Sequence, residues 1–386
     1  MNRTRKLFAV IVAFALLLSC LTAFETPADE SGVFEYYLDG DAAVLTKVNA
    51  SGDVVVPDTL GGKPVTTIDD AFRNNTKVTS VVLPDSLTVI KKNSFAYCTN
   101  LESITFNDGL SKIFEAAFSS CVKLSSVELP DSLTVLGQYA FAWCENLTYV
   151  KLSNSMRTID KGTFSGCTLL GYVDIPSSVR YIKQDAFGQT AYMSNKENRE
   201  NGMLYMGSYL LSVDTSVFGR CEIKPGTKTV ADRAFVLCNN VTEVVLYDDI
   251  VNIGEEAFFG CVNLSDVYFS GDVAKRKKLE IGKSNSRLEN ATWHYYYQPG
   301  VKEYMPGDIN GDDKVNNKDV LRLLKYHSDW DVDVKDTVLD VNGDGELNNK
   351  DVTRLFQYLS GWDVKIYSYN VGYDAGGGDS GPVISF

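Results

Sequence analysis

The sequence predicts an α+β protein: a long solenoid of 23-residue repeats followed by a small α-helical domain with two acidic loops. Three observations predict this fold. Apolar residues recur with one fixed period over most of the chain, an acidic loop pattern occurs twice near the C-terminus, and a short amphipathic helical stretch follows each copy. A chain of 386 residues has room for such a division into domains.

The first 24 residues are predicted to be a secretory signal peptide. Basic Arg3, Arg5 and Lys6 precede an apolar run over residues 7–18, which is short for a membrane span. We therefore expect a secreted, extracellular protein. The stretch that ends at Cys20 also resembles a bacterial lipobox, so a lipoprotein attached through Cys20 is the alternative.

The repeats are aligned by a phenylalanine column. Its members are Phe72, Phe95, Phe118, Phe141, Phe164, Phe187, Phe235 and Phe258. Phe95 follows Phe72 by 23 residues (95 − 72), and other apolar columns keep the same step. A unit this short cannot bury its own apolar face, so neighbouring units must stack and share one core.

The repeat motif resembles the BspA-like leucine-rich repeats of bacterial surface proteins, and the resemblance covers residues 32–297. Residues 52–57 with 61–65 resemble the N-terminal repeat of that family. Residues 188–220 fit an insertion or a degenerate repeat. The aromatic stretch 292–297 is predicted to cap the array.

Outward-facing strand positions form the predicted binding face of this solenoid. One column is Thr105, Glu128, Lys151, Asp174, Val245 and Tyr268, and its neighbour is Ser103, Ser126, Tyr149, Tyr172, Glu243 and Asp266. Tyr149, Tyr172 and Tyr268 can stack on sugar rings or pack against a protein. The alternative is that exposed strand positions simply favour Tyr and Thr.

Cysteines form a further column, three residues after the phenylalanines: Cys98, Cys121, Cys144, Cys167, Cys238 and Cys261. Cys221 lies outside that column. Strands about 4.8 Å apart would allow disulfides between repeats by distance alone. However, stacked side chains of one column point the same way, and a small thiol suits a packed core. We therefore expect free, buried cysteines.

Composition and charge argue against nucleic-acid binding and against catalysis. The formal net charge is −13, and the only basic run, residues 275–278, is expected to be a solvated face. The two histidines, His294 and His327, have no nucleophile in a recognisable context. We predict that the chain is not an enzyme. A hydrolase hidden in the solenoid remains a rival hypothesis.

Two acidic loops near the C-terminus predict two bound Ca²⁺ ions. In each loop, oxygen-bearing side chains occupy positions 1, 3, 5, 9 and 12, and position 7 offers a backbone carbonyl, which is the spacing that wraps a loop around Ca²⁺. The predicted ligands of the first loop are Asp308, Asn310, Asp312, Lys314, Asn316 and Asp319. Those of the second are Asp340, Asn342, Asp344, Glu346, Asn348 and Asp351.

The loops differ from an ordinary EF-hand because position 12 is Asp and a turn-like segment precedes each loop. This combination resembles the type I dockerin of cellulosome proteins, over residues 306–363. Residues 298–305 are then a linker and 364–386 a Gly-rich tail. The resemblance implies two loop–helix halves, related by a pseudo-two-fold axis, that bind a cohesin domain of a scaffold protein.

The resemblance also implies which residues contact the cohesin: Asn317, Lys318, Lys325, Asn349, Lys350 and Gln357. Both halves carry the same Asn-Lys pair, so either half could face the partner. Loop position 6 is Asp313 in one copy and Gly345 in the other, and we expect weaker Ca²⁺ binding at the first.

The predicted function is a secreted, non-catalytic binding or adhesion protein attached to a cellulosome-type scaffold, with a link to polysaccharide degradation. A surface adhesin with a calcium-stabilised module is the alternative, and a scaffold-borne hydrolase is the second. The ligand of the repeats, a protein or a glycan, is left open.

Overall fold

The computed structural model describes residues 32–295, 297, 307–312, 314–328, 330–332, 334, 339–344 and 346–366. These residues form two compact units. The first comprises residues 32–156 and 163–171, and the second comprises residues 157–162 and those from 172 onward. The repeats are thus divided between the two units. The signal peptide with Cys20, the linker 298–305 and residues 367–386 of the tail lie outside the described residues.

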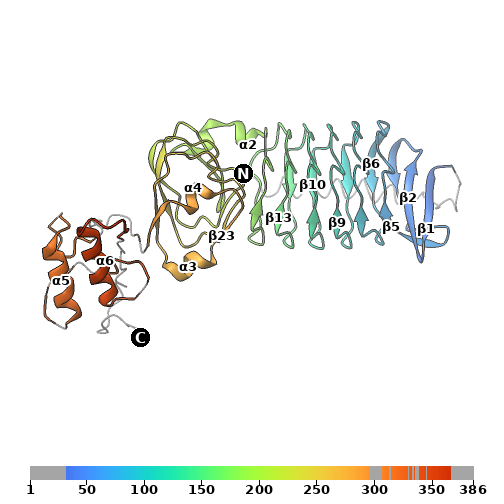
Figure 1. Cartoon of the computed structure of the whole chain (residues 1–386). Helices are drawn as coiled ribbons and strands as arrows, with labels where there is room; N and C mark the ends of the chain where they lie inside the picture. Colours follow the sequence, from blue (N-terminus) through green and yellow to red (C-terminus); the bar gives the residue numbers. More distant parts are fainter. Residues whose placement is uncertain are drawn as a thin grey trace, which may run out of the picture. The chain divides into compact units, whose positions relative to one another are not determined.

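Most regular repeats contribute two short β-strands, and many of these pair in parallel with the same strands of the next repeat (Figure 1). Val81 pairs with Ile104, and Ile90 pairs with Ile113. Both steps equal the 23-residue period of the sequence (104 − 81 and 113 − 90). One turn of the solenoid is therefore one sequence repeat, which confirms the predicted fold class.

The first unit contains a seven-stranded sheet, a three-stranded sheet and a two-stranded sheet. The seven-stranded sheet comprises β1 (Phe34–Asp39), β2 (Ala42–Val48), β4 (Thr59–Leu60), β5 (Lys63–Ile68), β7 (Val89–Ile90), β9 (Lys112–Ile113) and β11 (Val135–Leu136). The others comprise β3 (Gly52–Val55), β6 (Val78–Val82) and β8 (Ser103–Thr105), then β10 (Ser126–Glu128) and β12 (Tyr149–Lys151). Strands β1 and β2 form an antiparallel hairpin ahead of the predicted N-terminal repeat.

The second unit contains a two-stranded, a six-stranded and a four-stranded sheet. They comprise β13 (Thr158–Ile159) and β14 (Tyr181–Ile182), then β15 (Arg199–Glu200), β16 (Met203–Met206), β17 (Tyr209–Val213), β19 (Thr229–Val230), β21 (Asn252–Ile253) and β23 (Glu280–Ile281), and finally β18 (Gly219–Glu222), β20 (Val241–Leu246), β22 (Asp266–Phe269) and β24 (Thr292–His294). The helices are α2 (Ala191–Ser194), the 3₁₀ helix η1 (Lys196–Asn198), α3 (Val273–Lys278) and α4 (Ser286–Glu289).

Residues 188–220, which the sequence predicts to be an insertion or a degenerate repeat, depart from the regular repeat. They form α2, η1 and the antiparallel strands β15 to β17. The regular ladder resumes beyond them, because the backbone N–H of Asp232 donates to the carbonyl of Ile182 at 3.0 Å. The segment therefore adds antiparallel strands, and the last of them, β17, pairs in parallel with β19 of the next repeat.

The phenylalanine column forms the centre of the core. In the first unit, Phe72, Phe95, Phe118 and Phe141 stack with ring centroids 4.5–5.0 Å apart. All four are fully buried. The centroid spacing matches the strand spacing of about 4.8 Å, so one ring per repeat fills the core without a gap.

The cysteines in the described part of the chain are buried and free, as predicted. The thiols of Cys98, Cys121 and Cys144 each donate to the carbonyl of the column phenylalanine in the preceding repeat, at 3.0–3.2 Å. These bonds satisfy carbonyls at the corner of each turn. Cys221, outside this column, pairs in register with Val244 of the neighbouring strand and is buried as an inward strand residue.

The C-terminal module contains the helices α5 (Asn317–His327) and α6 (Asn349–Leu359). Buried Leu323 and Leu355 of the helices pack with Ile309, Leu339 and Val341 of the loops. This small core draws on both halves of the module. The helices and loops therefore form one body.

Candidate calcium and docking site

The position-12 aspartate organises the first acidic loop. Asp319 lies in the first turn of α5 and is fully buried. One of its carboxylate oxygens accepts the backbone N–H and side-chain amide of Asn310, at 3.1 and 2.8 Å. The other accepts the N–H of Asn316, while Asn316 caps the helix. One carboxylate thus closes the loop and starts the helix.

The second loop repeats this arrangement. Asp351 is fully buried and accepts the backbone and amide N–H groups of Asn342 at 3.1 and 2.7 Å. It also accepts the N–H of Asn348, which caps α6. The two halves therefore share one local geometry as well as one sequence pattern.

The loops gather negative charge away from solvent. Asp308 is fully buried and Asp340 nearly so. Burial raises the pKa of Asp319, and the neighbouring carboxylates of Asp308 and Asp312 raise that pKa further. Such crowded carboxylates favour a divalent cation, which would offset their mutual repulsion.

The donor set fits Ca²⁺, because each loop offers three Asp carboxylates with Asn side-chain and backbone oxygens. In the described part of the chain, no three Asp, Glu, His or Cys side chains converge closely enough to hold a metal. The position-12 carboxylates instead bond to the loop asparagines. The ligand assignment therefore stays a prediction. Position 6 of each loop, Asp313 and Gly345, lies outside the described residues.

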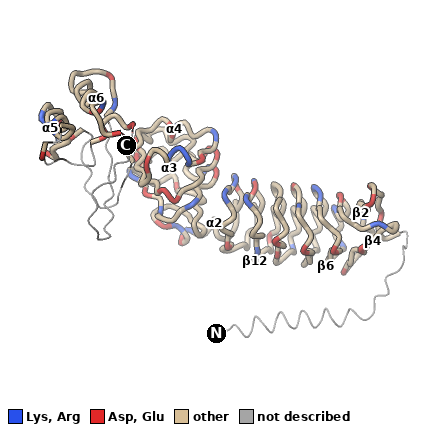
Figure 2. The backbone as a smooth tube through the Cα atoms, turned by 90° about the horizontal axis from the view of Figure 1, so that it is seen from below, with Lys and Arg blue, Asp and Glu red and all other residues tan. Residues whose placement is uncertain are grey.

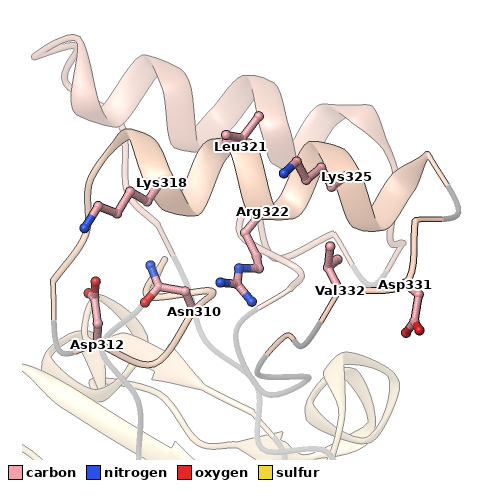
Figure 3. Close-up of a pocket in the computed structure, with 8 residues that line it drawn as sticks. All are labelled: Asn310, Asp312, Lys318, Leu321, Arg322, Lys325, Asp331 and Val332. Carbon is pink, nitrogen blue, oxygen red and sulfur yellow. The ribbon is translucent and has the colours of Figure 1, made fainter.

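The residues predicted to contact a partner lie along the helices. Asn317, Lys318, Asn349 and Lys350 are exposed at the helix starts, and Lys325 and Gln357 are half-buried further along. A pocket opens beside α5 (Figure 3). Its lining is Asn310, Asp312, Lys318, Leu321, Arg322, Lys325, Asp331 and Val332.

Sequence reasoning missed four exposed apolar side chains beside these residues. Leu324 and Phe356 lie on the two amphipathic helices, yet they are 45% and 59% exposed. Trp330 and Trp362 follow the two helices at the same distance and are 60% and 61% exposed. Their equal spacing from the two loops was the available signal.

The predicted repeat face is only partly an exposed surface. Tyr149 and Tyr172 are 51% and 56% exposed. Val245, predicted to face outward, is fully buried because Tyr247 and Tyr297 pack over it. Tyr268 stacks on His294 and lies beneath the Arg220 guanidinium, so it is a packing residue. The described residues of the aromatic stretch 292–297 pack as the predicted cap.

The basic run 275–278 is more than a solvated face. It lies on α3, where Figure 2 shows basic residues gathered. Arg276 packs over the Trp293 ring at 4.2 Å, and Lys275 forms an ion pair with Asp248. Two of the four basic residues, Lys275 and Arg276, therefore contact residues at the end of the repeats. The prediction of a solvated run agrees with exposed Lys275, Lys277 and Lys278 and is wrong for Arg276, which packs on the Trp293 ring.

The fold and the two loops define a class of protein: a repeat solenoid joined to a small docking module. Residues 66–194 and 205–290 match the BspA type leucine rich repeat region in six copies. Residues 306–360 match the dockerin type I domain. The chain belongs to the BspA type leucine rich repeat family and carries a C-terminal type I dockerin domain.

Solved structures of bacterial leucine-rich repeat proteins resemble this chain. The Treponema pallidum protein TpLRR is 27% identical, covering 64% of this chain and 93% of its own, with a TM-score of 0.37. A Faecalibacterium prausnitzii leucine rich cell surface protein is 21% identical, with coverage of 72% and 100% and a TM-score of 0.37. The pneumococcal vaccine antigen PcpA is 17% identical, with coverage of 72% and 90% and a TM-score of 0.39. No curated protein matched.

Both matched regions are non-catalytic modules, and no catalytic domain was matched. Within the described residues, every helix is too short or too polar to traverse a bilayer. The dockerin implies a cohesin as partner, and the repeats suggest binding or adhesion.

Proposed function

We propose that this chain is a secreted, non-catalytic binding protein that its dockerin attaches to a cohesin-bearing, cellulosome-type scaffold. The duplicated loop–helix unit carries this proposal. Each loop is closed by its own buried aspartate at position 12, and each is followed by a capped helix of the same length. The two halves therefore present two similar surfaces for a partner. The repeats would then carry the binding function to the scaffold.

Calcium acts in this proposal as the condition for docking. The predicted ligands are those of positions 1, 3, 5, 7, 9 and 12, with one ion in each loop. Buried Asp319 lies close to the carboxylates of Asp308 and Asp312, which raise its pKa. An ion would offset this repulsion and stabilise the loops and, through Asp319 and Asp351, the helices that they cap. Asp319 and Asp351 themselves would hold the loops closed and orient the helices toward the partner.

The repeats are proposed to bind a protein or glycan through their strand face. Exposed Tyr149 and Tyr172 support this location, since an aromatic ring held in solvent can stack on a sugar or pack on a protein. The proposed link to polysaccharide degradation depends only on attachment to a cellulosome-type scaffold, where this chain would lie beside polysaccharide-degrading enzymes.

The deciding experiment is a calorimetric titration of the full-length protein against a panel of type I cohesins, in Ca²⁺ and then in EDTA. We expect tight binding only with Ca²⁺. A full-length variant with Asp319→Ala and Asp351→Ala is the control and should not bind. Failure of every cohesin to bind the calcium-loaded protein would refute scaffold attachment.

The two rival functions have separate tests. Lipid on Cys20, seen in the intact mass of the protein from its native host, would favour a surface adhesin. Hydrolysis of plant polysaccharides or peptides by the purified chain, lost on substitution of a defined carboxylate pair, would favour an enzyme.

A further inference from the structure

Two exposed aromatic side chains occupy the same corner of the repeat in the first unit. Tyr97 and Trp143 each lie two residues after a column phenylalanine, and they are 52% and 47% exposed. They are 46 residues apart (143 − 97), which is two repeats. No hydrogen bond joins the Tyr97 hydroxyl or the Trp143 indole N–H to any described residue. The rings and their polar atoms are therefore available to a ligand.

Backbone hydrogen bonds hold the corners in register. The N–H of Tyr97 donates to the carbonyl of Ser119, and the N–H of Trp143 donates to the carbonyl of Ser165, at 2.8 and 2.7 Å. The buried phenylalanine rings over the two steps from one corner to the other are 4.7 and 5.0 Å apart. The two corners are therefore separated by about 10 Å, twice the spacing of neighbouring strands.

Each of these aromatic residues is followed by a small residue at the same corner of the next repeat. A Cβ added to Gly166 would lie 2.5 Å from Cε3 and 2.7 Å from Cδ2 of Trp143, so the indole lies over that glycine. One side of the indole thus rests on backbone, while about half of the side chain stays in solvent. Ser120 follows Tyr97, and it is too small to fill the space between the two rings.

Neutral amide groups accompany the rings along the chain. Asn100 and Asn146 each follow the aromatic residue by three positions, and so they keep the same two-repeat step. The Asn100 amide donates to the carbonyl of Thr76 at 2.6 Å, and Asn146 is exposed. In the repeat between them this position is Lys123, whose ammonium group lies 3.9 Å from a carboxylate oxygen of Glu102. An amide can both donate to and accept from sugar hydroxyl groups, so a neutral ligand suits this corner.

We infer that this corner of the first unit, with the rings of Tyr97 and Trp143, binds an extended β-1,4-linked glucan chain that lies along the stacking direction of the repeats. In such a chain every second sugar presents the same face, and the disaccharide repeat is close to the separation of the two corners. Two alternate sugars can therefore stack on the two rings, while the sugar between them passes over Ser120. The inference rests on the proposed binding function of the repeats. It places the site at the corner rather than on the strand face.

The second unit lacks these rings at the same corner position. The position is occupied there by Gln189, Leu237 and Gly260. Leu237 is 53% exposed and lies against Gly260, where an added Cβ would be 2.7 Å from Leu237 Cδ2. A large side chain over a glycine is thus a packing feature that both units share. The aromatic ring distinguishes the first unit, and Leu237 provides a matched control.

The test uses the full-length protein and two soluble glucans of equal length. Cellohexaose is the β-1,4-linked probe, and maltohexaose, with the same sugars in the α-1,4 linkage that makes the chain coil, is the control ligand. The variants are Tyr97→Ser, Trp143→Ser and both together, because Ser120 already occupies this corner position with a φ of 63°. Leu237→Ser, at a φ of 60° in the second unit, is the control variant.

A further variant separates the spacing of the rings from their number. Ser120→Trp combined with Trp143→Ser keeps two aromatic rings but places them one repeat apart instead of two. The urea midpoint of every variant is measured alongside, so that loss of the fold is recognised.

Affinity is measured by calorimetry. We expect the original protein to bind cellohexaose and not maltohexaose. Tyr97→Ser and Trp143→Ser should each weaken cellohexaose binding about tenfold, because each removes one stacking surface. The shifted-ring variant should bind as weakly as Trp143→Ser, the double variant more weakly still, and Leu237→Ser as the original does.

Four results overturn the inference: full affinity in the folded double variant, full affinity in the shifted-ring variant, equal binding of maltohexaose, or an equal loss in Leu237→Ser. No binding of cellohexaose by the original protein also overturns it and leaves a protein as the ligand of the repeats. Loss of cellohexaose binding on Tyr149→Ala with Tyr172→Ala, but not on the corner substitutions, would exclude the corner and keep the strand face. Failure of every cohesin to bind would refute scaffold attachment and leave these results unaffected.

Discussion

At the scale of single residues, the corners of the repeat depend on left-handed backbone. The position two residues after the column phenylalanine has φ between 60° and 78° in Asn74, Tyr97, Ser120, Trp143 and Gly166. Residues other than glycine adopt this conformation at a cost of about 1–2 kcal/mol. At Gly166 the Trp143 ring also fills the space above the backbone, since a Cβ there would lie 2.5 Å from Trp143 Cε3. Only glycine meets both conditions.

We predict that Gly166→Ala lowers the free energy of unfolding of the repeats by at least about 1–2 kcal/mol, from backbone strain together with the displaced Trp143 ring. Urea denaturation measures the change. Gly171→Ala is the control in the same unit, because no atom lies within 4 Å of its added Cβ. Equal losses in the two variants would contradict the role of the left-handed corner.

The cysteine column should be chemically inert in the folded protein. Burial raises the pKa of Cys121 and Cys144 well above the ordinary value and that of Cys167 to about 12. Thiolate is therefore scarce below that pH, and each thiol is shielded by its neighbours. We predict no alkylation of these three cysteines by iodoacetamide at pH 8, and complete alkylation in urea, measured by peptide mass spectrometry. Rapid alkylation of the native protein would disprove the buried column.

At the scale of elements, each loop–helix half depends on one side chain. Asp319 and Asp351 fasten their loops and cap their helices, so loop order and helix formation are coupled. This coupling explains how a cation could influence a helix surface without touching it.

We predict that Asp319→Ala reduces the number of Ca²⁺ ions bound per chain from two to one, and that Asp351→Ala does the same, because each removes a predicted ligand and a loop closure. Calorimetry of the full-length protein with Ca²⁺ counts the ions. Asp363→Ala, which removes an exposed carboxylate of the same module, should leave the count at two. Undiminished calcium binding by the double variant would exclude these ligands.

At the scale of the whole molecule, the repeats and the dockerin depend on different forces. Within each unit the repeats bury stacked rings and thiols, whereas the dockerin core contains five fully buried apolar residues. A core that small leaves little stability of its own, so a bound cation would add substantially to it. Calcium should therefore act on one part of the chain alone.

We predict that EDTA abolishes the hydrogen-exchange protection of α5 and α6 and leaves that of the repeat strands unchanged. A cation that binds only the folded dockerin stabilises it by about 2.7 kcal/mol at one hundred times its dissociation constant. Exchange followed by mass spectrometry on the full-length protein separates the two regions. Protection of both helices in EDTA would contradict metal-linked folding.

The sequence by itself determined the repeat period, the buried phenylalanine and cysteine columns, the insertion and the two loop–helix halves, because stacking and cation binding both require residues at fixed spacings. Only the tertiary structure decided which outward positions stay exposed. Val245 and Tyr268 lie at outward strand positions, but Tyr247 and Tyr297 pack over Val245, and Arg220 of β18 lies over the Tyr268 ring. The structure also decided that Lys350 is paired while Lys318 is not, since pairing depends on where a flexible side chain meets a neighbouring loop. The sequence period predicts whether a strand side chain points inward or outward. Its burial and its ion pairs depend instead on which other residues of the folded chain pack against it.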